Sequence, residues 1–190
     1  MTVTTIPSAG ITDATIATAD IADDAVTAAK ATGFGKIGQV KQTVKKDTFT
    51  TNSSSFTLIT GLSVSITPTA TSSKILIKTF INFGGDNNTY GHCRLLRGST
   101  SILVGDAGEA NQTRSAFALQ TDNSTAAIYK VHFGGIEFLD EPITTSALDY
   151  SIHLITYSSD NIYINRPQNN ENIDRTGRYT STITAMEVLA

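Results

Sequence analysis

Residues 74–83 have the sequence KILIKTFINF, the clearest structural signal in the chain. Branched and aromatic residues of this kind fit a pleated strand, and they form a nearly continuous run here. The segments TATSS (69–73) and GGDNN (84–88) on either side carry the small and amide residues of turns. We therefore predict a strand bounded by two loops, the first of which follows Pro68.

Alternation of apolar and polar residues extends the strand pattern in both directions from this segment. Phe56 and Leu58, then Leu62, Val64 and Ile66, alternate with polar residues, and Gly61 interrupts the two runs as a bulge would. The segments HCRLLRG (92–98) and SILVG (101–105) predict a hairpin with Gly98-Ser99 at its tip.

The rest of the chain carries short segments of the same kind, separated by polar turns. We expect strands at 37–44, 115–120, 127–133, 136–139, 147–157 and 161–165, and in the closing segment TSTITAMEVL (180–189). In that last segment Thr182, Thr184 and Met186 alternate against Ile183, Ala185 and Glu187. About ten short strands with almost no helical periodicity predict an all-β fold, an antiparallel β-sandwich or jelly roll.

Composition limits the class of protein. The 190 residues suit one domain with a short appendage, and the single Cys93 forms no internal disulfide. A net charge of −3 argues against a nucleic-acid surface. No apolar run approaches the length of a membrane helix, and the N-terminus MTVTTIPSAG has no basic region followed by an apolar core. We expect neither a secretory signal nor membrane insertion, and folding in a reducing cytosol.

The first 33 residues contain a five-residue repeat. Its branched apolar positions are Ile11, Ile16, Ile21 and Val26. A spacing of five matches neither one face of a helix nor one face of a strand. The segment is therefore either a stalk in which several chains share an axis, with these four residues as its core, or a low-complexity tail. Asp23-Asp24 also allow a short capped helix that ends at Gly33.

This gives three regions. Residues 1–33 are the N-terminal anchor or stalk, 34–48 a connecting segment with the first strand, and 49–190 the β head. Several head strands carry large apolar residues among Ser and Thr, namely Phe80, Phe83, Tyr150, Ile152 and Leu154. A sandwich fills its core with one face of each sheet, which leaves an outer apolar face free to meet neighbours around a threefold axis. The sequence does not say which positions face that axis.

Several motifs resemble those of a known family. The segments ITPTATSSKILIK, RLLRGSTSILVGDA, FLDEPITTSALDY and YINRPQ with RYTSTITAMEV occur in this order, after the repeat DATIATADIADDAVTAAK. Together they resemble C-terminal domains of bacteriophage tail-fibre and virion-appendage proteins. The resemblance implies a jelly-roll head like those of tumour necrosis factor and complement proteins, assembled as a homotrimer. It also implies attachment to the virion through the N-terminus, with the head presented to a host-surface glycan or protein.

Residues with catalytic or metal-binding chemistry form no recognised motif. His92, His132 and His153 lack metal-ligand spacing, and no G-x-S-x-G elbow is present. His92 and Cys93 are neighbours on a strand and so point to opposite faces. Asp140 and Glu141 precede Pro142 and suit a turn, although paired carboxylates also cleave glycans. We expect no enzyme activity, no cofactor and no metal.

Polar loops provide the candidate receptor contacts, because amides and carboxylates beside aromatic rings suit sugars. One patch is Asn87, Asn88 and Tyr90, and a second is Asn165, Arg166, Asn169, Asn170, Asp174 and Arg175. Ordinary polar loops of a sandwich have the same composition.

Three functions are consistent with these features. The first is a short homotrimeric phage fibre, assembled in the host cytoplasm and located on the virion, whose head contacts the host surface. The second is a capsid decoration or head-fibre protein that binds and cements the shell, for which a short stalk is favourable. The third is a polysaccharide-cleaving appendage that uses Asp140 or Glu141. The expected partners are further copies of the chain, other virion proteins and a host-surface molecule.

Overall fold

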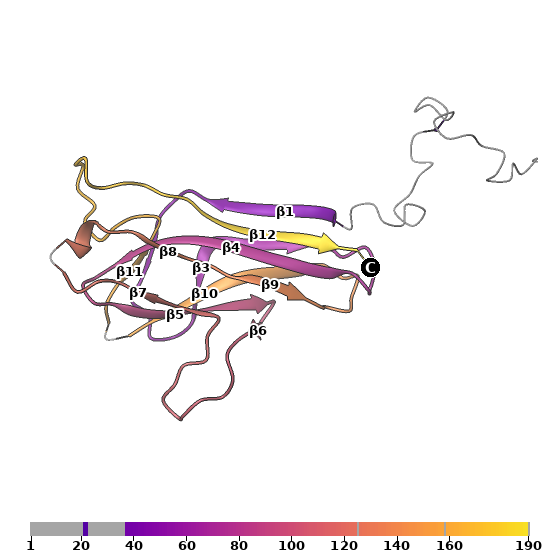
Figure 1. Cartoon of the computed structure of the whole chain (residues 1–190), viewed down its shortest axis with the longest axis horizontal. Coiled ribbons are helices and arrows are strands. Elements are labelled where there is room, and N and C mark those ends of the chain that lie inside the picture. Colours follow the sequence, from indigo (N-terminus) through magenta and orange to yellow (C-terminus); the bar gives the residue numbers. More distant parts are fainter. Residues whose placement is uncertain (1–20, 23–36, 125, 158, 190) are drawn as a thin grey trace, which may run out of the picture. The chain divides into compact units, whose positions relative to one another are not determined.

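Two antiparallel sheets face each other in the structure, a computed structural model that describes residues 21–22, 37–124, 126–157 and 159–189. Both sheets belong to one unit, Ile37–Ala190 (Figure 1). The strands are β1 (Ile37–Lys45), β2 (Phe49–Thr51), β3 (Thr57–Ile66), β4 (Lys74–Gly85), β5 (Tyr90–Arg97), β6 (Thr100–Leu103), β7 (Phe117–Gln120), β8 (His132–Gly134), β9 (Glu137–Asp140), β10 (Leu148–Thr156), β11 (Ile162–Ile164) and β12 (Ser181–Val188). A short 3-10 helix, η3 (Ala127–Tyr129), precedes β8.

The strand order is that of a jelly roll. One sheet has the order β1-β12-β4-β11-β2, with β8 and β9 also paired to β4. The other sheet has the order β3-β10-β5-β6, with β7 also paired to β5. The strands β1, β3, β4 and β5 alternate between the two sheets, and the last strand pairs between the first and the fourth, so the sheets form a double-layered roll. The predicted all-β antiparallel jelly roll is confirmed.

The core lies between the sheets and follows the predicted alternation. Its fully buried residues include Ile59, Leu62, Ile75, Ile77, Ile81, Leu95, Tyr150, Ile152 and Leu154. Each large apolar side chain buried in this way stabilises the fold by about 1.5–3 kcal/mol. The core therefore accounts for one face of each sheet.

Two local features predicted from glycine are confirmed. Gly98 has φ +59° in the two-residue turn between β5 and β6, where Arg97 pairs with Thr100. Gly61 has φ +81°, and the register of β3 against β10 shifts between Ser151 and His153. Both positions need the left-handed backbone that glycine adopts without strain.

Two segments differ from the prediction. Gly84 and Gly85 belong to β4 rather than to a loop, because they pair with Tyr163 and Ile162 of β11. The chain after β11 then crosses so closely that a Cβ on Gly84 would lie 2.7 Å from the Arg166 carbonyl oxygen. Residues 127–133 were expected as one strand, but they begin with η3. Its turns close through hydrogen bonds from the amides of Ala127 and Lys130 to the carbonyls of Ser124 and Ala127.

The N-terminal predictions fall mostly outside the described residues. Ile11, Ile16 and Val26 of the expected stalk core are not described, and Ile21 is 44 % exposed. The stalk stays a prediction. Within the part of the chain that the structure describes, no helix has the length and hydrophobicity that a membrane span requires.

Candidate functional site

The seven-stranded sheet has a second apolar face, directed away from the core. Its register places Val40, Met186, Leu76 and Leu139 side by side across β1, β12, β4 and β9. Directly paired residues share a face, and their neighbour Ile75 is in the core, so this row points outward. Val40 is 55 % exposed and Leu139 44 %.

Two aromatic rings form a second apolar group on the same face, separated from this row by the polar row Gln42, Thr184, Lys78 and Glu137. Phe80 pairs with Thr182, beside Val44, and its ring stacks on that of Phe133 with 5.5 Å between centroids. Phe133, on β8, is 72 % exposed. We call the set Val40, Val44, Leu76, Phe80, Phe133, Leu139 and Met186 the outer apolar face.

The outward face of the other sheet is different in character. Ser63 pairs with Ser151, and Arg94 pairs with His153. This face also exposes Leu58 and Tyr90, so it is mixed rather than polar throughout. Exposed apolar side chains that gather on one face of a soluble protein mark an interaction surface. The contrast between the two sheets makes the outer apolar face the stronger candidate interface.

The sequence analysis grouped residues that the structure separates. Phe83, Tyr150, Ile152 and Leu154 lie in the core, whereas Phe80 lies on the outer apolar face. The alternation within β4 already separates Phe80 from the core residues. Phe80 has an even residue number, whereas the buried Ile75, Ile77 and Ile81 have odd ones. The outward orientation of Val40 and Leu139 was not predictable from their own strands, because it follows from the pairing of β1 with β12 and of β9 with β4.

The two predicted loop patches lie at one end of the sandwich, opposite the C-terminus (Figure 1). The Asn88 amide donates to the Asp122 carbonyl at 3.1 Å, and Asn87 Nδ2 donates to Asn123 Oδ1 at 3.0 Å. In the second patch the Asn169 amide donates to the Ile128 carbonyl at 2.8 Å. The loop between β7 and β8 therefore contacts both patches.

The exposed members of these patches are Asn87, Asn88, Tyr90, Asn170, Asp174 and Arg175, and Asn169 is half-buried. Asn165 is fully buried, which corrects its assignment as a receptor contact. Its Nδ2 donates to the carbonyls of Lys45 and Asp47, each at 2.9 Å, and its Oδ1 accepts from Ser181 Oγ at 2.6 Å. Arg166 is also committed internally, with its guanidinium 4.0 Å from the centre of the Tyr163 ring.

Asp86 is an acidic residue with several hydrogen-bond donors around it, and the sequence analysis did not single it out. Its carboxylate accepts hydrogen bonds from the Asn161 amide and side chain, each at 2.8 Å, and from the Tyr163 hydroxyl at 2.7 Å. Burial alone would raise its pKa, but these hydrogen bonds and the charge of Arg166 hold the pKa below its ordinary value. Asp86 thus fixes the loop after β4 against β11, and no signal in GGDNN distinguished it from its neighbours.

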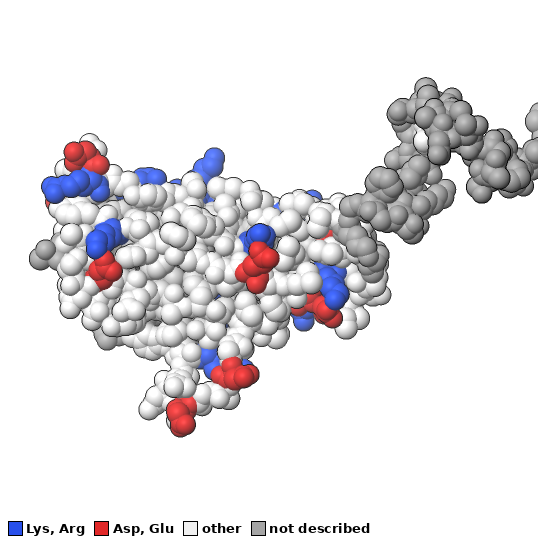
Figure 2. Space-filling model, viewed as in Figure 1, with Lys and Arg blue, Asp and Glu red and all other residues white. Residues whose placement is uncertain are grey.

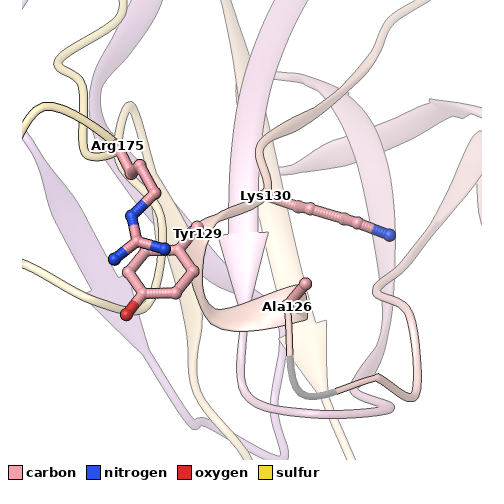
Figure 3. Close-up of a pocket in the computed structure, with 4 residues that line it drawn as sticks. All are labelled: Ala126, Tyr129, Lys130 and Arg175. Atoms are coloured by element: carbon pink, nitrogen blue, oxygen red, sulfur yellow. The ribbon is translucent and has the colours of Figure 1, made fainter.

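A hollow of about 530 Å³ lies beside η3, lined by Ala126, Tyr129, Lys130 and Arg175. Figure 3 shows the Arg175 guanidinium lying against the Tyr129 ring, with Lys130 extending in another direction. The guanidinium carbon is 5.0 Å from the ring centroid. Of these four residues, only Arg175 was among the predicted receptor contacts.

The groups considered for catalysis are placed as follows. Asp140 is 6 % exposed, and its oxygens accept from Arg97 Nη1 at 3.0 and 2.7 Å and from the Tyr150 hydroxyl at 2.6 Å. This network joins β9 to the opposite sheet, and burial beside Asp140 raises the pKa of Tyr150. Glu141 instead pairs with Lys74 at 2.5 Å. The arrangement lends the polysaccharide-cleaving alternative no support.

Cys93 and the histidines are also placed by the structure. Cys93 is fully buried, which raises the pKa of its thiol, whereas His92 is half-buried on the opposite face with Nδ1 2.9 Å from Ser115 Oγ. His132 stacks on Phe83. Among the described residues, no three His, Cys, Asp or Glu side chains form a cluster suited to a metal ion.

The charged side chains form small mixed groups. Figure 2 shows blue and red side chains next to one another, separated by wide uncharged areas on the visible face. The ion pairs Lys74–Glu141, Lys78–Glu137 and Lys130–Asp122 on the surface agree with this distribution. This visible face lacks the one-signed charge of a phosphate-binding surface.

No family model and no curated protein matches this sequence. Among solved structures, the chain is similar to the Eiger tumour necrosis factor of S. frugiperda, with 11 % identity, a TM-score of 0.38, and coverage of 80 % of this chain and 92 % of that one. It is also similar to the VP2 protein of infectious bursal disease virus in derived T=1 particles (12 %, TM-score 0.35) and in a subviral particle (13 %, TM-score 0.33). The match covers 80 % of this chain and 36 % and 38 % of the VP2 chains. The chain is an all-β jelly roll by its own strand order.

Proposed function

We propose that this chain is a non-enzymatic virion structural protein, a short homotrimeric phage fibre. In this proposal its N-terminal segment attaches to the virion and its jelly-roll head contacts the host surface. The virion role and the number three come from the resemblance of the sequence motifs to phage appendage proteins. The structure supports the association of several copies of the chain.

The observation that carries the proposal is the outer apolar face. The core already consumes one face of each sheet, so Val40, Leu139 and Phe133 contribute nothing to it and are exposed in a single chain. Burying each of these side chains between copies is worth about 1.5–3 kcal/mol. A ring of three copies meets this need with one repeated, closed contact.

The assembly is tested by the solution mass of the purified full chain, measured by light scattering after size exclusion. The chain has a mass of 20.2 kDa, so a trimer has three times that mass. A trimer that persists on dilution supports the proposal. A monomer at every concentration overturns the trimeric fibre.

The position on the virion is tested with the same sample. The fibre role predicts that the purified trimer adheres to host cells and blocks infection, because it competes with virions for the surface. Binding to empty capsids in many copies, without any block of infection, would instead identify a capsid decoration protein. Infection blocking is multivalent, so it requires the trimer to be intact.

A further inference from the structure

The hollow beside η3 combines an aromatic ring with two cationic side chains. Tyr129 is half-buried, so its ring offers an apolar surface, while Lys130 and Arg175 are exposed. Among the described residues, those that line the hollow include no acidic one. Lys130 pairs with Asp122, whereas Arg175 makes no ion pair within the described residues. The hollow therefore presents a guanidinium that has no ion pair among the described residues and lies over an aromatic ring (Figure 3).

The lining residues are held in place by backbone contacts. The Asn169 amide donates to the Ile128 carbonyl at 2.8 Å, which ties the loop after β11 to η3. The turn that carries Arg175 is closed by the Thr176 hydroxyl, which donates to the Glu171 carbonyl at 2.6 Å. Tyr129 and Arg175 are thus brought together by two hydrogen-bonded turns, and little ordering is left for a ligand to drive.

Some unpartnered buried polar atoms lie near η3 and the loop after β11. Among the described residues, four buried side-chain atoms have no hydrogen-bond partner in the protein. Three of them are Ser124 Oγ, His132 Nε2 and Gln168 Oε1, which flank η3 or the Asn169 contact. These atoms are buried and belong to none of the four described residues that line the hollow, so the site rests on Tyr129 and Arg175.

We propose that this hollow binds an anionic sugar, with Arg175 holding the oxyanion and Tyr129 packing against the sugar ring. A guanidinium binds a carboxylate or phosphate through two parallel hydrogen bonds, and an aromatic face suits the apolar C–H face of a pyranose. The Arg175 guanidinium lies 5.0 Å from the centre of the Tyr129 ring, so a monosaccharide whose oxyanion is held by Arg175 lies next to that ring. Lys130 extends in another direction and pairs with Asp122, so Arg175 alone holds the oxyanion. This inference deepens the proposed host-surface role and rests on it for its biological meaning.

The test is a binding titration on the full chain with three probes: trigalacturonic acid, glucose 6-phosphate and neutral galactotriose. We expect the galacturonate or the phosphate to bind and the neutral trisaccharide not to bind. The stronger of the two charged probes identifies whether the oxyanion is a carboxylate or a phosphate. Equal binding of all three probes, or of none, overturns the proposal.

Variants then locate the site. Arg175→Gln removes a charge-assisted hydrogen bond and should weaken binding by about ten-fold or more, and Tyr129→Ala should do the same by removing the ring. The matched control is Arg114→Gln, an exposed arginine in the β6–β7 loop, which projects well apart from η3 in Figure 1. Unchanged binding in Arg175→Gln, or equal loss in Arg114→Gln, contradicts the site.

The test of the sugar site and the test of the trimeric fibre can fail independently. A trimer that blocks infection but binds no charged sugar overturns only the hollow. A monomer that binds galacturonate and loses binding in Arg175→Gln overturns the trimeric fibre and keeps the site. The melting temperature of each variant shows whether a loss of binding is a loss of fold. We expect that of Arg175→Gln to lie within a few degrees of the parent, because Arg175 is exposed.

Discussion

Glu187 is fully buried on β12 although it is a carboxylate. It accepts hydrogen bonds from Gln39 Nε2 at 2.8 Å and from the Thr69 amide and hydroxyl at 2.6 and 2.7 Å. Burial would raise its pKa, but these hydrogen bonds outweigh it and lower the pKa from 4.5 to about 2. Glu187 thereby anchors the loop between β3 and β4 to the end of the sandwich.

The lowered pKa of Glu187 makes the fold sensitive to acid. Its stabilisation is complete above pH 4.5, the ordinary pKa, and is lost as the pH falls toward about 2. We expect Glu187→Gln to be less stable than the parent at pH 7, and the difference to shrink between pH 5 and pH 2. Urea unfolding at a series of pH values measures this. A difference that stays constant across that range would contradict the role of the ionised carboxylate.

Asn165 is another residue whose polar side chain is fully buried. Replacing it with alanine leaves the Lys45 and Asp47 carbonyls and the Ser181 hydroxyl without their partner. We expect Asn165→Ala to lower the free energy of unfolding by about 2–3 kcal/mol. The exposed Asn170→Ala serves as the control and should change it by less than about 0.5 kcal/mol. Equal effects of the two changes would show that the buried network does not stabilise the loop.

The alternation of apolar and polar residues predicted which side chains face the core. It did not predict which polar side chains are buried. The faces of β12 follow the expected alternation, with Ile183 and Ala185 in the core. The burial of Glu187 was not predicted, because its donors Gln39 and Thr69 are more than a hundred residues away in the sequence. Asn165 was assigned to the surface for the same reason.

The fourth strand continues through Gly84 and Gly85, where the chain after β11 crosses it closely. A Cβ on Gly84 would lie 2.7 Å from the Arg166 carbonyl oxygen and 2.9 Å from Pro167 Cα, and backbone cannot move as easily as a side-chain tip. We expect Gly84→Ala to lower the free energy of unfolding by about 1–3 kcal/mol.

Gly105→Ala is the matched control for this change, because nothing lies within 4 Å of a Cβ at that position. It should leave the midpoint of urea unfolding nearly unchanged. If Gly84→Ala also left the midpoint unchanged, the close crossing of β4 by the segment 166–167 would be wrong.

Long strands were predictable because their alternation is local. The pattern in 74–83 and 147–157 marked β4 and β10 within a residue or two at most ends. The segment 127–133 was not, because Ala, Ile, Tyr and Val suit a strand as well as a short 3-10 turn. Its turn is fixed by contacts with Asn169, which the local sequence does not contain.

The outward faces of the two sheets carry different residues, because strand pairing determines which residues gather on each face. Sequence analysis predicted that an outer apolar face would exist but did not assign it to a sheet. The pairing of β1, β12, β4 and β9 brings Val40, Leu76, Leu139 and Met186 together from four distant segments. The candidate receptor loops likewise adjoin only because β7 and β8 are joined by a loop that contacts both.

Charges placed on the outer apolar face should prevent assembly of the chain. In Val40→Lys/Leu139→Lys, association would bury two charges without partners, which costs several kcal/mol. Leu58→Lys/Tyr90→Lys is the matched control, since Leu58 and Tyr90 are exposed residues of the other sheet. Both variants gain the same charge, so a general charge effect would appear in both.

Light scattering of the parent and these two variants is the most direct test that the outer apolar face joins three copies. The account predicts a mass of three times 20.2 kDa for the parent and for Leu58→Lys/Tyr90→Lys, and 20.2 kDa for Val40→Lys/Leu139→Lys. A monomeric parent, or a Val40→Lys/Leu139→Lys variant that remains a trimer, would contradict it.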